Sequence, residues 1–88
     1  MNWIVERADS FLKDLSKYRK NSELLNALDN KIKRLEIDPE NVGGMLSGRL
    51  HGKQSTRLIR KFRLIFQINE SERKVYLVAI DHRKDVYE

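Results

Sequence analysis

The sequence contains no cysteine, so it can form neither disulfide bonds nor thiolate metal sites. Its two histidines, at positions 51 and 82, are too few to make a dedicated metal site by themselves. No apolar run approaches the roughly 18 residues that a membrane-spanning helix needs. The first residues, which include Glu6 and Arg7, do not resemble a signal peptide. We therefore expect a cytoplasmic protein with no metal, no cofactor and no membrane contact.

Proline and glycine are scarce, and they are confined to one part of the chain. The single proline, Pro39, and all four glycines lie between residues 38 and 54. Because these residues interrupt helices and strands, they predict a loop over residues 38–54, longer than most loops in compact domains. Gly43-Gly44 lacks the Gly-Lys-Ser/Thr sequence of a phosphate-binding loop. With 88 residues, we expect residues 1–88 to form a single domain around one core.

Carboxylates are absent between Asn41 and Asn69. Residues 1–40 contain eight Lys/Arg and eight Asp/Glu, whereas residues 41–88 contain ten and five, which accounts for the whole net charge of +5. A block of one sign attracts polyanions, above all phosphodiester backbones, although a merely solvated surface has a similar composition. The cations of the carboxylate-free segment are Arg49, Lys53, Arg57, Arg60, Lys61 and Arg63.

The first half of the chain predicts a strand and a helical hairpin. Trp3 to Val5 is a short β-branched and aromatic run that indicates a strand. A first helix, with Asp9 or Ser10 as N-cap, and a second, capped by Asn21-Ser22 and ended by Pro39, should follow. Their apolar residues repeat every three to four positions: Phe11, Leu12, Leu15 and Tyr18, then Leu24, Leu25, Leu28, Ile32 and Leu35.

Alternation of apolar and polar residues begins after the glycine segment. It predicts strands at residues 55–59, 62–68 and 74–80, with a tight turn at Arg60-Lys61. The fold class is therefore α+β, with a strand, two helices and a three-stranded meander, and with the helices packed on one face of an antiparallel sheet. The other face would carry Arg63. Strand parity allows Arg57 to share that face, depending on the register.

Arginine suits phosphate recognition, because its planar fork donates two parallel hydrogen bonds and keeps its charge. A second cationic cluster, His82-Arg83-Lys84, lies close to Tyr87 near the end of the chain. His82 and Tyr87 are the nearby groups suited to proton transfer or to orienting a nucleophile. The sequence contains neither the aromatic strand of an RNA-recognition motif nor helix-turn-helix spacing, so phosphate chemistry is better supported than binding alone.

Two segments resemble the RelE/ParE toxin superfamily. The stretch from Leu50 to Gln67 is similar to its central hairpin, in which a basic strand is followed by an aromatic residue or histidine, an arginine and an apolar strand (Phe-Arg-Leu-Ile-Phe here). The ending Asp81-His-Arg-Lys-Asp-Val-Tyr87 resembles the family's terminal "GHRxxVY" signature. The order of elements agrees as well, so the resemblance spans essentially the whole chain.

The resemblance implies a RelE-like toxin of a type II toxin–antitoxin pair, which cleaves ribosome-bound mRNA. In that reaction an RNA 2′-OH attacks the adjacent phosphorus and leaves a 2′,3′-cyclic phosphate. Arg57, Arg63 and Arg83 would then clamp the phosphate and the transition state. Tyr87 would stack on or orient the attacked nucleotide, and His82 is a possible acid or base. The cations that would hold the messenger or ribosomal backbone are Lys53, Arg60, Lys61 and Lys84.

The implied protein partner is a RelB-like antitoxin whose carboxylates pair with the arginines; operator DNA would be bound only through that antitoxin. YoeB-like members have a glutamate base near the hairpin entrance, but residues 42–47 contain no carboxylate. The base is therefore left open between His82 and a basic residue with a lowered pKa. Two alternative functions remain: a ParE-like inhibitor of DNA gyrase, and a non-catalytic or degenerate toxin that binds nucleic acid.

Overall fold

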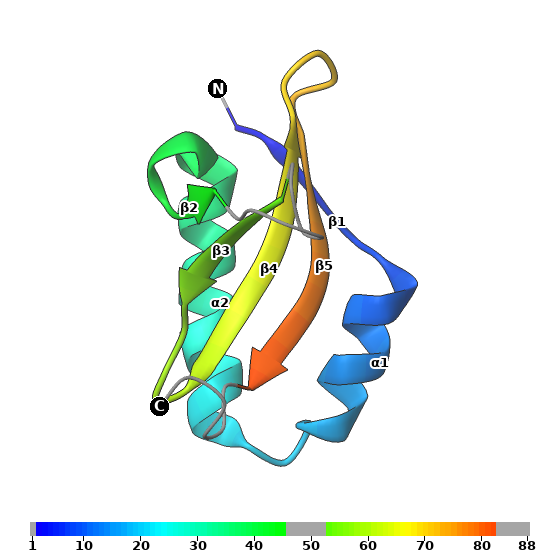
Figure 1. Cartoon of the computed structure of the whole chain (residues 1–88), viewed down its shortest axis with the longest axis vertical. Helices are drawn as coiled ribbons and strands as arrows, with labels where there is room; N and C mark the ends of the chain where they lie inside the picture. Colours follow the sequence, from blue (N-terminus) through cyan, green and yellow to red (C-terminus); the bar gives the residue numbers. More distant parts are fainter. Residues whose placement is uncertain (1, 46–52, 83–88) are drawn as a thin grey trace.

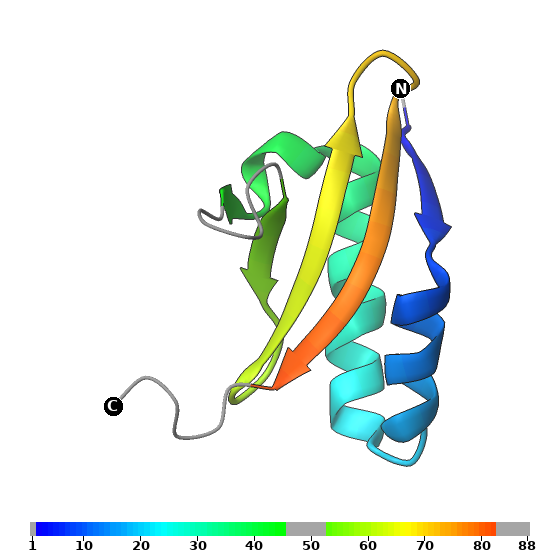
Figure 2. The same cartoon turned by 45° about the vertical axis from the view of Figure 1, so that its right-hand side comes forward.

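A computed structural model describes residues 2–45 and 53–82. Its elements follow in the order β1 (Ile4–Arg7), α1 (Asp9–Lys17), α2 (Ser22–Ile37), the 3-10 helix η1 (Pro39–Asn41), β2 (Gly44–Met45), β3 (Gln54–Arg57), β4 (Phe62–Asn69) and β5 (Lys74–His82). The strands form one sheet in the order β1-β5-β4-β3-β2 (Figure 1). Both helices cover the same face of this sheet (Figure 2). The α+β architecture is therefore confirmed. None of the helices described is long and apolar enough to cross a membrane.

The sheet is mixed, whereas the sequence predicted an antiparallel one. β1 runs parallel to β5, with Ile4 opposite Lys74 and Arg7 opposite Leu77, while the other pairs are antiparallel. Alternation of residue types does not encode strand direction, so this pairing was not predictable from the pattern.

The predicted loop of residues 38–54 also contains regular structure. The helix η1 begins at Pro39, and β2 pairs Gly44 with Ser55 and Met45 with Gln54. A two-residue strand is too short to show alternation of apolar and polar residues, so β2 was not predictable from the pattern.

The helix ends agree with the sequence only in part. The side chain of Asn21 caps α2, because its Oδ1 accepts a hydrogen bond from Leu24 N at 3.1 Å. α2 ends at Ile37, two residues before Pro39, as expected. The N-cap of α1 is Ala8, which has no side-chain hydrogen bond, so the prediction of Asp9 or Ser10 was wrong. The Ser10 hydroxyl instead donates to the carbonyl oxygen of Val78 in β5.

The core lies between the helices and one face of the sheet. Alternate residues of β4 are buried on this side, which confirms the predicted two-sided strand. Ile65 departs from that pattern: it shares the face of Arg63, yet it is only 6% exposed. The fully buried side chains include Phe11, Leu24, Leu35, Leu64, Phe66, Val75 and Leu77.

Helix α1 completes the hydrogen bonding of β5 where β1 has ended. β1 pairs with β5 only as far as Leu77. Beyond that point Asp14 Oδ2 accepts a hydrogen bond from Ile80 N at 2.9 Å, and Ser10 donates to Val78. Since Ser10 and Asp14 are one helical turn apart, they reach successive groups of the same strand edge. The last residues of β5 are thereby fixed in position.

The two adjacent glycines of the β2 segment have different surroundings. A Cβ added at Gly43 would collide with the backbone carbonyl of Ser55 and would crowd the Phe66 ring at 3.1 Å, whereas a Cβ at Gly44 would meet nothing within 4 Å. We expect Gly43→Ala to lower the free energy of unfolding by about 1–3 kcal/mol, because backbone must move. Gly44→Ala is the matched control and should change it much less. Chemical denaturation of both variants tests this, and equal losses would contradict it.

Two carboxyl groups, Glu40 and Glu70, meet at the end of the molecule where β4 turns into β5. A hydrogen bond to Glu70 and repulsion by its charge raise the pKa of Glu40 above its usual 4.5. A raised pKa in the folded state means that protonation favours folding below pH 4.5, and that this advantage is lost as the pH rises through the folded-state pKa. Glu40→Gln should therefore raise Tm at pH 7, with a gain that disappears near pH 3. Glu70→Gln removes the group that raises the pKa of Glu40, so it should also raise Tm at pH 7. A gain of the Glu40→Gln variant that persists at pH 3 would refute this explanation.

Candidate nucleic-acid interface

Arg57 and Arg63 lie directly opposite one another across β3 and β4. Their strand neighbours Thr56 and Leu64 are buried toward the helices, so the two arginines share the opposite face of the sheet. Opposed residues in an antiparallel pair have Cβ atoms about 4.5–5.5 Å apart, and two like charges at that separation repel. The shared face that strand parity allowed is confirmed, and an anion between the guanidinium groups would relieve their repulsion.

The guanidinium group of Arg63 is held by Ser55. Arg63 Nη1 donates a hydrogen bond to Ser55 Oγ at 3.2 Å, and Ser55 is only 6% exposed. Arg57, in contrast, is exposed. The pair thus combines one oriented cation with one that reaches into solvent. Sequence reasoning missed Ser55; its position two residues before Arg57 on the same strand was the available signal.

On its other side Arg63 faces Asp81 of β5. The sheet therefore carries a row of three charged residues, with Arg63 in the middle. Opposite charges across strands attract, so Asp81 offsets part of the repulsion between the arginines. Asp81 was also missed, because its register with Arg63 depends on the β4–β5 pairing, which the sequence did not specify.

His82 is placed on the helix-covered side. It is the register partner of Phe62, and the two rings lie 4.5 Å apart between centroids, tilted by 30°. Tyr18, at the end of α1, meets Phe62 edge-on at 5.0 Å. The structure therefore brings Arg57 and Arg63 together, but it places the His82 ring on the opposite face of the sheet, at the same end.

Among the other candidate residues that the structure describes, two lie in the β3–β4 turn and one lies at the far end of β3. Lys53 is half-buried just before β3, while Arg60 and Lys61 are exposed in the β3–β4 turn. Arg60 has a positive φ of 55° and its Nη2 lies 3.1 Å from Glu23 Oε1 in α2. Arg83, Lys84 and Tyr87 lie outside the described residues, as does His51. The described part of the chain contains no group of three or more His, Cys, Asp or Glu side chains suited to a metal.

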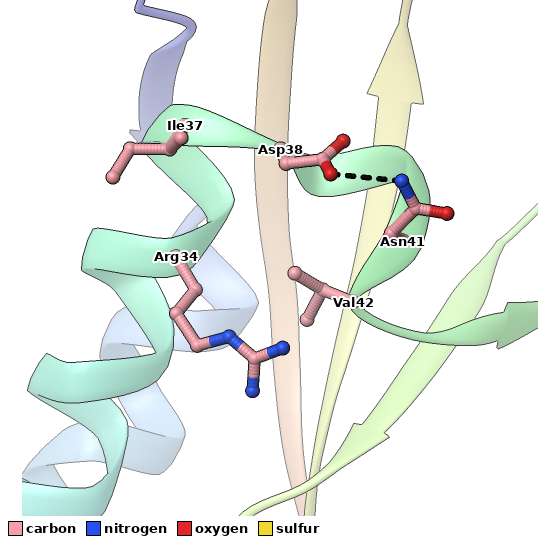
Figure 3. Close-up of a pocket in the computed structure, with 5 residues that line it drawn as sticks. All are labelled: Arg34, Ile37, Asp38, Asn41 and Val42. Atoms are coloured by element: carbon pink, nitrogen blue, oxygen red, sulfur yellow. Dashed lines mark hydrogen bonds between the residues drawn. The ribbon is translucent and has the colours of Figure 1, made fainter.

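A pocket of about 240 Å³ lies at the other end of the molecule, where α2 meets η1 (Figure 3). Arg34, Ile37 and Val42 line it together with Asp38 and Asn41, and Asn41 Nδ2 donates to Asp38 Oδ2 at 2.8 Å. Its one carboxylate is thus already engaged. The pocket offers no set of groups for catalysis, and the arginine pair remains the candidate site.

Comparison with known protein families identifies the family to which the chain belongs. Residues 5–87 match the family described as "ParE toxin of type II toxin-antitoxin system, parDE". The chain belongs to this toxin family. The predicted membership of the RelE/ParE superfamily is confirmed, and with it the role of toxin in a type II toxin–antitoxin system.

Solved structures of several toxins share the fold. A chain of the toxin–antitoxin complex RelBE2 from Mycobacterium tuberculosis is 25% identical with a TM-score of 0.79, over 94% of this toxin and 100% of that chain. A YoeB/ParE toxin from Agrobacterium tumefaciens is 14% identical at 0.78, over 92% and 99%. A metal-bound toxin from Helicobacter pylori is 24% identical at 0.75, over 97% and 99%. No curated protein sequence matches the toxin.

If the positive charges of Arg57 and Arg63 repel each other, replacing one of the two arginines should raise the free energy of unfolding of the toxin. We expect Arg57→Thr to raise the free energy of unfolding by about 0.2–1 kcal/mol, because like charges directly across a strand pair are destabilising. The same variant should bind heparin more weakly. Arg7→Thr is the matched control, since Arg7 is also an exposed strand residue but faces Leu77. Urea denaturation and heparin chromatography measure both effects; a destabilised Arg57→Thr variant would contradict the prediction.

Proposed function

We propose that this toxin is a ribosome-dependent endoribonuclease that cleaves mRNA and so inhibits translation. The observation that carries the proposal is the opposed pair of Arg57 and Arg63, with one guanidinium oriented by Ser55. The pair lies on a sheet face that none of the described helices covers (Figure 2). Two such forks match the oxygens of a phosphodiester, and fixed donors stabilise charge that develops at phosphorus. Membership of a toxin family makes an essential cellular polymer a suitable target.

The proposed reaction is a transesterification within the RNA. The 2′-oxygen forms a bond to the adjacent phosphorus, the bond from phosphorus to the 5′-oxygen breaks, and the products are a 2′,3′-cyclic phosphate and a 5′-hydroxyl. A base takes the proton of the 2′-OH, and an acid returns a proton to the leaving oxygen. The negative charge that accumulates on the phosphoryl oxygens is greatest midway, so donors placed there accelerate the step.

The described residues receive roles that their placement permits, whereas the roles of Arg83, Lys84 and Tyr87 follow from the resemblance to the RelE/ParE superfamily. Arg63, oriented by Ser55, is proposed to hold a phosphoryl oxygen in the transition state, and Arg57 to close on the same group from β3. Arg83 and Tyr87 are proposed to complete the clamp and to stack on the nucleotide. His82 stays a candidate acid or base. Its ring contacts Phe62 at the edge of the core, so it would have to act from the helix-covered side of the sheet. Lys53, Arg60, Lys61 and Lys84 are proposed to hold the RNA backbone.

The proposed inhibitor is a RelB-like antitoxin. The M. tuberculosis relative comes from a toxin–antitoxin complex, which supports a protein partner of this kind. Carboxylates of the antitoxin would occupy the place of the phosphate between Arg57 and Arg63, with the same charge and a similar separation of oxygens. The complex would bind operator DNA through the antitoxin. We also propose that the toxin acts in the cytoplasm, where ribosomes and messengers are available.

Toeprinting of a ribosome-bound messenger tests the proposal. We expect new cuts in the ribosomal A site that disappear when ribosomes are omitted. Arg63→Ala should reduce the cleavage rate by about 10²-fold or more, because loss of one transition-state donor has effects of that size. Arg7→Ala removes the same charge from β1 and should leave the rate unchanged.

Two results would overturn the proposal. One is the absence of ribosome-dependent cuts; inhibition of gyrase supercoiling by the same preparation would then identify DNA topology as the target. The other is cleavage that Arg63→Ala and Arg7→Ala reduce equally, since the arginine pair would then have no specific part in the reaction.

A further inference from the structure

We propose that the turn between α1 and α2 forms a second polyanion-binding surface, the hairpin patch, which contacts the backbone of structured ribosomal RNA beside the messenger. The patch consists of four exposed cations, Lys13, Lys17, Arg19 and Lys20. This inference rests on the proposed function, in which the ribosome is the target. It assigns ribosome binding to residues that lie away from Arg57 and Arg63.

The charge of the hairpin patch is scarcely offset by neighbouring carboxylates. Lys13 and Lys17 are one helical turn apart, where like charges destabilise a helix by a few tenths of a kcal/mol. The carboxylates beside the turn are Asp14 and Glu23, and Glu23 is already paired with a cation outside the patch, since its Oε1 lies 3.1 Å from Arg60 Nη2. Asp14 is turned toward β5: its Oδ2 accepts from Ile80 N, and its Oδ1 lies 3.7 Å from Lys17 Nζ. The patch therefore presents a surplus of positive charge to solvent.

The hairpin patch lies at the same end of the molecule as the arginine pair. The edge-on contact of Tyr18 with Phe62 joins the α1–α2 turn to the start of β4, and the ion pair of Arg60 with Glu23 joins the β3–β4 turn to α2. Figures 1 and 2 both show these two turns at the lower end of the molecule. The two cationic clusters thus flank one aromatic stack, the patch on the helix side and the arginines on the open face of the sheet.

Within residues 2–45 and 53–82, the opposite end of the toxin carries a surplus of carboxylates. The end of α2, η1 and the β4–β5 turn carry the carboxylates Glu36, Asp38, Glu40, Glu70 and Glu72, which Arg34, Arg73 and Lys74 offset only in part. A hydrogen bond to Glu70 and, after it, repulsion by the charge of Glu70 raise the pKa of Glu40 at this end. A molecule with a basic and an acidic end turns its basic end toward a polyanion as it approaches.

The placement of the two clusters indicates what kind of polyanion fits. They lie on opposite sides of the sheet, so a single RNA strand laid across Arg57 and Arg63 does not run along the hairpin patch without wrapping around the end of the molecule. Two backbones close together satisfy both clusters at once. Folded RNA, in which strands run side by side, supplies this arrangement, whereas an isolated messenger does not.

A salt titration of binding to purified ribosomes tests the hairpin patch. Each lost phosphate contact lowers the slope of log K against log salt by about 0.7–0.9, so Arg19→Gln/Lys20→Gln should reduce the slope by about 1.4–1.8 and weaken binding about tenfold. The control Lys33→Gln/Arg34→Gln removes the same charge from the far part of α2 and should leave the slope unchanged. At saturating ribosomes the cleavage rate of the patch variant should equal that of the wild type. Thermal unfolding checks that both variants fold.

The outcomes separate this inference from the proposed function. An unchanged slope and affinity in the Arg19/Lys20 variant, or an equal loss in the control, overturns the hairpin patch even if mRNA is cleaved. Failure of the wild-type toxin to bind ribosomes overturns it as well. If the wild type binds ribosomes and the patch variant binds them with the reduced slope, but no cleavage occurs, the patch is supported and the endoribonuclease proposal fails.

Discussion

The register of β4 against β3 and β5 is the constraint on which both the core and the charged face depend. With this register Leu64 and Phe66 pack under the helices, while Arg63 lies between Arg57 and Asp81 on the other face. Because side chains alternate along a strand, a slip of one residue would exchange the two sets and would bury a guanidinium. Burial of the apolar residues of β4 therefore also holds the arginines in place. Stability and site geometry have the same physical origin.

The arginine pair illustrates a local conflict that the fold accommodates. Two cations face one another where a neutral cross-strand pair would be more stable, and one of them is tethered to a buried hydroxyl. Such departures from the most stable choice are characteristic of functional sites. Here the repulsion is between β3 and β4, and Asp81 of β5 offsets part of it. The buried residues on the other face of these strands keep the sheet intact.

A feature of this structure was predictable from the sequence where it depends on residues close together in the chain, and not where it depends on contacts between distant segments. Alternation in β4 and helical spacing around Leu24 and Leu28 are local, so the elements, their faces and the α+β class were predictable. The shared face of Arg57 and Arg63 was allowed by strand parity but did not follow from the predicted turn. A two-residue turn at Arg60-Lys61 would pair Arg57 with Leu64, whereas β3 ends at Arg57 and four residues connect it to β4. The parallel β1–β5 pair, the role of Ser55, and the stacking of His82 on Phe62 depend on contacts between distant segments, which strand parity alone does not specify. His82 shows the limit most clearly: its neighbours in sequence are charged, while its neighbours in space are aromatic.

The side chains that α1 places along β5 have a consequence for self-association. A strand edge with unpaired backbone groups is a template on which another chain can aggregate. Ser10 and Asp14 occupy those groups of β5 beyond Leu77. At the far side, the described part of the sheet ends in β2, which is two residues long. A short edge and an edge capped by side chains are both ways to discourage pairing between copies. The helix that packs the core thus also protects a small, highly charged protein from joining its own sheet to that of its neighbour.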